Sequence, residues 1–216
     1  MSRGARFLGI DVGARTLHCA TIDEQAVSVK RAALPAEDTE ALAHWCADAE
    51  AVAIDAPEAP STAPHVEETG LSPKFRRARC AEIELGRRHG SWVSWVAPVE
   101  APFPPWMEAG FRAFATLRDA GAPELLEVYP YACFRALAAG RRPAPKQTLA
   151  GRKERVRLLA AAGVAVDRFA TFSHDFLDAT VAALTALDRA RGRARPVTCG
   201  HDASAIWLPA DGPVRQ

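Results

Sequence analysis

The stretch FLGIDVGARTLHCATID, residues 7–23, contains two apolar runs separated by a short polar segment. The first run ends in Asp11, and Gly13 follows two residues later. Both runs have the length and composition of buried strands, and the short connection predicts a hairpin. Asp11 then either caps the turn, as Asp often does before Gly, or presents a carboxylate at the edge of a sheet. On this stretch alone, the turn cap is the simpler interpretation.

Length and composition are those of an ordinary globular chain. The protein has 216 residues, of which 49% are hydrophobic and 25% charged. This is enough for one well-buried domain. No apolar run approaches the ~20 residues that span a bilayer, and the start MSRGARF has no hydrophobic signal region. We therefore expect a single cytoplasmic domain over residues 1–216 with no membrane partner.

The cysteines are odd in number and widely spaced in the sequence, and they form no CxxC motif or Cys/His cluster there: Cys19, Cys46, Cys80, Cys133 and Cys199. This spacing argues against a structural zinc site and against a disulfide framework. We expect buried free thiols in a reducing compartment.

Charge is nearly balanced overall but clustered locally. The net charge of +1 gives no global attraction to nucleic acid. The run GRRPAPKQTLAGRKERVR, residues 140–157, nevertheless carries seven Lys or Arg against one Glu. Such runs are usually solvated helix faces, and the alternative is a surface that binds phosphate or another anion.

Hydrophobic patterning predicts the order of the elements along the chain. The expected strands cover residues 6–13, 16–23, 26–34, 51–57, 125–129 and 203–209, and the expected helices cover residues 36–49, 73–88, 106–119, 130–140, 151–162 and 173–192. Three strands, a helix and a fourth strand, followed by helices and further strands, is the order of the ribonuclease H fold. We expect an α/β protein whose mixed sheet has three antiparallel strands and then parallel strands, flanked by helices. Residues 58–122 form a helical and proline-rich insertion.

Acidic residues follow the predicted strands. In a ribonuclease H-like sheet the first and fourth strands lie side by side, so Asp11 and Asp55 become neighbours at one edge. Glu127, on the strand at 125–129, is a third acid. Close carboxylates repel one another unless a cation lies between them, and all-oxygen sites suit Mg²⁺ or Mn²⁺. Asp11 is therefore better explained as half of a carboxylate pair than as a turn cap.

The last predicted helix adds two aspartates. HDFLDA, residues 174–179, places Asp175 and Asp178 three apart, on one helix face. Asp175 lies in the first turn, where it either acts as an N-terminal cap or serves as a ligand. Asp178 lies deeper, among apolar residues, where an unpaired carboxylate is costly. This cost favours Asp178 as the site residue.

Six motifs resemble, in order, those of domain-of-unknown-function family 429, whose members are described as predicted nucleases with a ribonuclease H fold: GIDVGA, AIDAP, RCAEIELGRRHG, EVYPYACFRAL, PKQTLAGRKERVRLLAAAGV and HDFLDATVAALTA. The resemblance runs from about Phe7 to Pro209. It implies that the acidic positions are Asp11, Asp55, Glu127 and Asp178. It also implies that Lys146, Gly151, Arg152 and Arg155 form the family's Lys/Gly/Arg segment, and that Arg79 and Glu84 lie on its central helix.

One motif departs from the family pattern. The family usually has EVHPE, whereas this chain has EVYPY, so Tyr129 and Tyr131 replace a His and a second acid. Glu127 is retained, but the missing acid weakens a metal role near Tyr131. The spacing of HDFLDA also resembles the DxxD of RuvC-type resolvases, over a short stretch only.

These features predict a divalent-metal-dependent nuclease. In that interpretation Mg²⁺ or Mn²⁺ is held by Asp11, Asp55, Glu127 and Asp178, with Asp175 as a further candidate ligand. The phosphates of DNA or RNA would be bound by Lys146, Arg152, Arg155 and Arg79. If the basic segment faces away from the acids, the substrate path runs along Arg76, Arg77 and Arg79 instead.

Two alternatives remain open. The first is a phosphotransferase of the actin and sugar-kinase superfamily, whose first phosphate loop resembles residues 7–23. That architecture needs two domains, and 216 residues hold barely one. The second is a non-catalytic module that keeps the fold and binds an anion or nucleic acid. Metal binding distinguishes the classes, because a live site is stabilised by Mn²⁺ through mass action.

Overall fold

The computed structural model describes residues 5–26, 29–166 and 173–212, and it has a seven-stranded mixed sheet in the order β3-β2-β1-β4-β5-β7-β6. The first three strands are antiparallel: β1 (Arg6–Val12), β2 (Thr16–Asp23) and β3 (Val29–Pro35). The next three continue the sheet in parallel: β4 (Ala49–Asp55), β5 (Leu125–Val128) and β7 (Ile206–Leu208). β6 (Arg195–Val197), which the sequence analysis missed, pairs antiparallel with β7. Val27 and Ser28 of the expected third strand lie outside the described residues.

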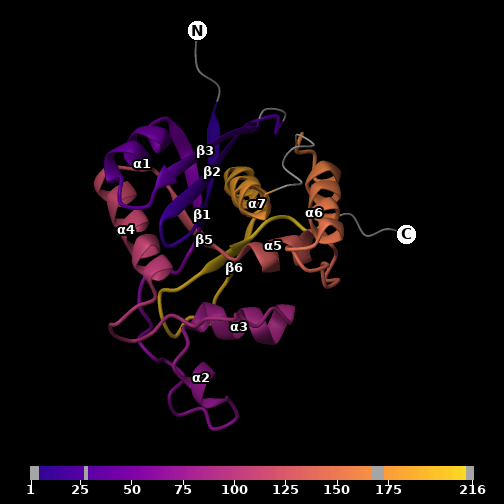
Figure 1. Ribbon diagram of the computed structural model, residues 1–216. Coiled ribbons are helices and arrows are strands. Elements are labelled where there is room, and N and C mark those ends of the chain that lie inside the picture. The colour runs from indigo at the N-terminus through magenta and orange to yellow at the C-terminus, as the bar shows by residue number, and fades with distance from the viewer. Residues whose placement is uncertain (1–4, 27–28, 167–172, 213–216) are drawn as a thin grey trace.

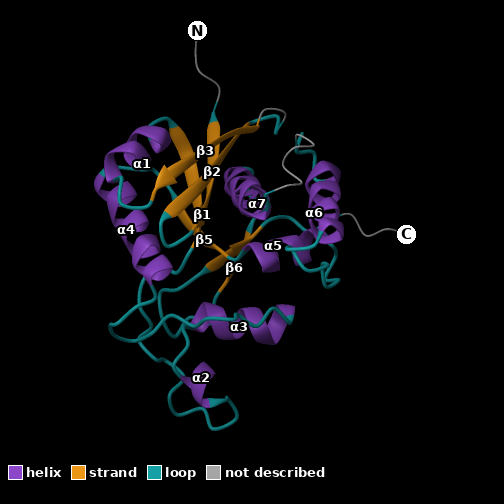
Figure 2. Cartoon of the chain, in the orientation of Figure 1, coloured by secondary structure: helices purple, strands orange, loops and turns teal. Residues whose placement is uncertain are grey.

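Helices cover both faces of the sheet (Figures 1 and 2). One face carries α1 (Thr39–Cys46) and α4 (Pro105–Asp119), and the other carries α5 (Pro130–Leu137), α6 (Leu149–Ala161) and α7 (His174–Ala190). Each face has its own apolar cluster. The mixed α/β sheet flanked by helices is therefore confirmed.

The segment over residues 58–122 contributes three helices in two places. α4 packs beside α1, whereas α2 (Pro73–Arg76) and α3 (Cys80–His89) lie beyond the end of the sheet (Figure 1). Among the described residues, no helix is both long and apolar enough to cross a bilayer.

α7 approaches the central strands closely enough to require a glycine. A Cβ built on Gly9 of β1 would lie 1.9 Å from the Ala179 carbonyl oxygen and 2.3 Å from the Ala183 nitrogen. The helix begins at an N-cap, Ser173, whose hydroxyl accepts a hydrogen bond from the Phe176 backbone at 3.3 Å. Asp175 is therefore not the cap, and its Oδ1 instead lies 2.7 Å from the Nδ1 of His174.

The cysteines divide into two groups. Cys19, Cys46 and Cys133 are buried free thiols, as expected. Cys80 and Cys199 instead form a disulfide, with their Cα atoms 5.4 Å apart. The expectation of free thiols is wrong for this pair, because the fold brings together residues separated by 119 positions.

Candidate metal centre

Asp11 and Asp55 lie opposite one another on adjacent parallel strands. β1 and β4 pair in register as Gly9↔Ala53, Ile10↔Ile54 and Asp11↔Asp55. Residues in register point to the same face of a sheet, and here that face carries α7. The two carboxyl groups are close enough for each to influence the pKa of the other. The expected adjacency of the first and fourth strands is confirmed.

α7 adds a third carboxylate, and the loop before α6 adds a cation. Asp178, only 2% exposed, lies against the Asp11–Asp55 pair. Its Oδ2 accepts from the Lys146 ammonium at 2.5 Å. Lys146 belongs to the loop between α5 and α6 and also acts electrostatically on Asp11 and Asp55. We call Asp11, Asp55, Asp178 and Lys146 the carboxylate cluster.

Burial disfavours the charged forms of these carboxylates. Desolvation and the Asp178 charge raise the pKa of Asp11 to about 7, and Lys146 offsets only part of that rise. Desolvation and the charge of Asp11 raise the pKa of Asp55 well above its ordinary value. Desolvation also raises the pKa of Asp178, despite the Lys146 contact. Three carboxylates, of which Asp11 and Asp178 are buried and Asp55 half-buried, share one ammonium, so the cluster is short of positive charge at neutral pH.

A histidine that the sequence analysis missed adjoins the cluster. His18 is the β2 partner of Asp11, and its Nδ1 lies 3.7 Å from the Asp11 Oδ2. That buried nitrogen has no hydrogen-bond partner among the described residues. Asp11, His18 and Asp175 each offer one ligand atom, all within 4.8 Å of one another. The register of the predicted hairpin is the signal that places His18 here.

Glu127 departs from its expected position because of side-chain alternation. β5 pairs with β4 as Ile54↔Glu127, so Glu127 shares a face with Ile54 and not with Asp55. Both of its carboxylate oxygens accept from the Arg79 guanidinium, at 2.6 and 2.5 Å. The Glu58 backbone donates a further bond at 2.8 Å. Glu127 therefore lies outside the carboxylate cluster and serves as the partner of Arg79.

The arginines expected to bind phosphate are held by protein groups. Arg79, 3% exposed, also donates to Glu82 at 3.1 Å. Arg155, equally buried, donates to the carbonyl of Ala144 at 2.8 Å. Arg152 donates to the carbonyl of Gln147 at 2.7 Å. Since the last two carbonyls flank Lys146 on either side, Arg152 and Arg155 position the loop that carries Lys146.

The family model described as "Protein of unknown function (DUF429)" matches residues 9–202, which is most of the chain. The chain belongs to the DUF429 family. No curated protein and no solved structure among those compared matches it. Family membership is therefore confirmed. Because the family description names no function, any activity has to be argued from the geometry of the site.

A cavity of about 160 Å³ lies beside Asp55 in this DUF429 protein. Asp55 and the Arg79–Glu127 pair line it, together with aromatic side chains from three segments: Trp95, Trp106 and Tyr129. Trp95 is 64% exposed. Tyr129, part of the EVYPY motif, thus lines the cavity. The cavity places apolar rings and a carboxylate of the cluster side by side.

Proposed function

We propose that this protein is a divalent-metal-dependent nuclease with a ribonuclease H-like fold. The observation that carries the proposal is the in-register pair Asp11 and Asp55, which faces Asp178 from α7. Metal-dependent phosphodiester hydrolysis in DNA or RNA uses oxygen ligands that converge in this way.

The topology supports the fold assignment. The sheet begins with three antiparallel strands and continues in parallel through β4 and β5, with β1 beside β4. This is the arrangement that the order of elements in a ribonuclease H fold requires. The long helix α7 packs on β1, β2 and β4, over the face that carries the aspartates.

The side chains fit a divalent cation. Asp11, Asp55 and Asp178 would hold Mg²⁺ or Mn²⁺, which prefer carboxylate oxygens, and the orphaned Nδ1 of His18 and the carboxylate of Asp175 lie next to them. When bound, such an ion supplies a Lewis acid and lowers the pKa of a coordinated water. Burial is the first cause of the raised pKa values of the three aspartates, and a bound cation would favour their charged forms.

The chain's own groups would bind and orient the substrate. Lys146, 34% exposed, reaches the cluster from solvent and offers its remaining ammonium protons to a phosphate oxygen. The exposed ring of Trp95, at the cavity beside Asp55, offers a face on which a base can stack. A phosphate at Lys146 and a base at Trp95 would place the scissile bond near the aspartates.

One observation favours a second candidate, the non-catalytic binding module. The Lys146–Asp178 ion pair at 2.5 Å already gives the cluster an internal cation. A protein that keeps this pair closed would bind an anion at the surface without hydrolysing it. The two candidates differ in whether a divalent cation enters the cluster.

The test is hydrolysis of single- and double-stranded DNA and RNA with Mg²⁺ or Mn²⁺, comparing wild type with Asp11→Asn and Asp55→Asn. Loss of a residue that only hydrogen-bonds to a metal ligand lowers metal affinity or activity by about 10–100-fold. Loss of a ligand itself should therefore lower the cleavage rate by about a hundredfold or more. Asp119→Asn, an exposed carboxylate on α4 at the opposite face, is the matched control and should keep full activity. Equal cleavage by wild type and both site variants would overturn the nuclease assignment. If the wild-type protein binds these nucleic acids but cleaves none of them, the non-catalytic binding module is the better assignment.

A further inference from the structure

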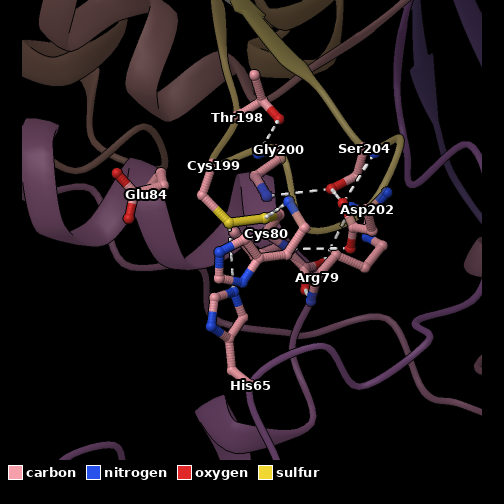
Figure 3. The surroundings of a disulfide bond; sticks show 12 residues. His65, Arg79, Cys80, Glu84, Thr198, Cys199, Gly200, Asp202 and Ser204 are labelled. Atoms are coloured by element: carbon pink, nitrogen blue, oxygen red, sulfur yellow. Dashed lines mark hydrogen bonds and ion pairs between the residues drawn. A yellow bond between two sulfur atoms is a disulfide. The ribbon is translucent and has the colours of Figure 1, made fainter. Parts of the chain in front are cut away.

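A second group of metal-ligating side chains lies at the start of α3, separate from the carboxylate cluster. The Cys80–Cys199 disulfide has His65 beside it, and Figure 3 shows the His65 ring pointing toward the two sulfur atoms. The Nε2 of His65 lies 3.5 Å from the Cys199 sulfur. The His201 ring stacks on His65, with centroids 5.5 Å apart. His65, Cys199 and His201 each offer one ligand atom, all within 4.8 Å of one another.

The surroundings of His65 are those of a metal-ligating histidine. Its side chain is 2% exposed, and its Nδ1 is hydrogen-bonded to a Glu68 carboxylate oxygen. A carboxylate on one ring nitrogen orients the other toward a metal and makes it a better ligand. Glu68 is itself held by Arg87 at 2.5 Å. The Nε2 is the atom that faces the sulfur.

The two cysteines are also well placed to act as metal ligands. Cys80 is fully buried and is the first residue of α3, where the helix N-terminus favours a thiolate. Its sulfur accepts a hydrogen bond from the His201 backbone at 3.3 Å. The loop that carries Cys199 and His201 is fixed to α3, because Asp202 accepts from the Cys80 backbone at 3.1 Å. Ligands from three distant segments are thus held together by bonds that do not involve the sulfur–sulfur bond.

We propose that the reduced protein binds one Zn²⁺ through Cys80, Cys199, His65 and His201. A dithiol reductant opens the disulfide: it supplies two electrons and two protons, both cysteines become thiols, and the reductant becomes a disulfide. Each thiol then releases its proton as it binds the metal. Two thiolates and two neutral imidazoles balance the charge of the ion, and S₂N₂ is a common tetrahedral zinc set.

Binding the metal requires local movements of the four ligand atoms. Zinc bonds of about 2.3 Å to sulfur and about 2.0 Å to nitrogen set tetrahedral ligand atoms about 3.3–3.8 Å apart. The ligand atoms of His65, Cys199 and His201 already lie within 4.8 Å of one another, so they have to approach by up to about 1 Å. His201, which is exposed, can supply that movement. The Cys80 and Cys199 sulfurs have to move in the opposite sense: from a bond of about 2.0 Å they separate to about 3.8 Å once the disulfide is reduced. The soft donors here select zinc, whereas the carboxylate cluster selects Mg²⁺ or Mn²⁺, so the two sites would take different metals.

The test uses Co²⁺ as a spectroscopic substitute for zinc. The full chain is reduced with dithiothreitol, freed of it without oxygen, and titrated. Reduced wild type should show a thiolate-to-cobalt charge-transfer band at one ion per chain, and Zn²⁺ should abolish it. Cys199→Ser should lose the band, and exposed His201→Ala should bind at least about tenfold more weakly. Cys46→Ala, which removes a buried free thiol on α1, is the control and should behave as wild type.

Two further readouts separate the outcomes. Zn²⁺ should raise the melting temperature of the reduced protein. The oxidised protein, titrated with Co²⁺, should show no thiolate-to-cobalt band. Ions held only by the carboxylate cluster give no such band, so they cannot imitate the result. The proposal is wrong if reduced, folded wild type gives no charge-transfer band. It is equally wrong if folded Cys199→Ser keeps the band unchanged.

Discussion

Asp11→Asn should stabilise the protein in the absence of a divalent cation. The substitution keeps the shape of the side chain and removes one of the charges that repel one another in the carboxylate cluster. The gain should depend on pH, because Asp11 is costly to the fold only when it is ionised.

The structure sets the size and the sign of the effect. A rise of the Asp11 pKa from its ordinary 3.8 to about 7 corresponds to about 4 kcal/mol, and the side chain is nearly buried. Since the folded state binds this proton more tightly, the associated stability is present below about pH 4. It is lost as the pH rises through about 7. Relaxation of the neighbours lowers the cost, so we expect a gain of about 1–4 kcal/mol at pH 8 and almost none at pH 4.

Urea unfolding with a chelator present, at pH 4 and pH 8, measures this difference. Asp188→Asn is the matched control, because Asp188 lies on α7 and is buried like Asp11, at 2% exposed against 8%. Its carboxylate, unlike that of Asp11, accepts from Arg193 at 2.5 Å and from the Ala210 backbone at 2.9 Å. Asp188→Asn should therefore lose stability at pH 8. Added Mn²⁺ should stabilise wild type and leave Asp11→Asn almost unchanged.

An Asp11→Asn protein that is less stable than wild type at pH 8 without cation would refute this reasoning. So would a gain of the same size at pH 4 and pH 8, because repulsion between carboxylates vanishes when they are protonated.

Two further substitutions test other contacts. Glu127→Gln breaks the buried pair with Arg79 and should lower the free energy of unfolding by about 3–5 kcal/mol, measured by urea unfolding. Mn²⁺ affinity, measured by calorimetry on the folded variant, should stay at the wild-type value, and a large loss would restore Glu127 as a ligand. Gly9→Ala should cost about 1–3 kcal/mol and weaken Mn²⁺ binding, because the new methyl group pushes α7 away from β1. Gly70→Ala, where an added Cβ meets nothing within 4 Å, is its control, and equal behaviour of the two would show that α7 tolerates the methyl group.

The local sequence pattern was sufficient to predict most helices and strands and to place the central aspartates. Strand-length apolar runs gave β1, β2 and β4, and the order of elements placed Asp11 beside Asp55. The same reasoning missed β6, a strand of three residues that contains Pro196 and has no alternating pattern. Strands this short are defined by their neighbours and leave little signal of their own.

The errors at the site arise from geometry beyond strand order. Glu127 was grouped with the aspartates because it lies on a neighbouring strand, but side-chain alternation turns it to the other face. Arg152 and Arg155 have the charge that phosphate binding requires, yet they bond to backbone carbonyls around Lys146. Cys80 and Cys199 are 119 residues apart, and the spacing of cysteines in the sequence cannot predict a pairing over that separation.

The placement of Asp178 on α7 has a consequence for synthesis on the ribosome. Asp11 and Asp55 emerge early, whereas α7 is among the last elements to be made. Until it emerges, the face of β1 and β4 that carries both aspartates lacks its main cover, and the Lys146 ammonium lacks its partner. Contacts between such distant parts of a chain form late in folding. A nascent or truncated chain that stops before residue 173 should therefore be inert, so any nuclease activity would begin only when nearly the whole chain has left the ribosome.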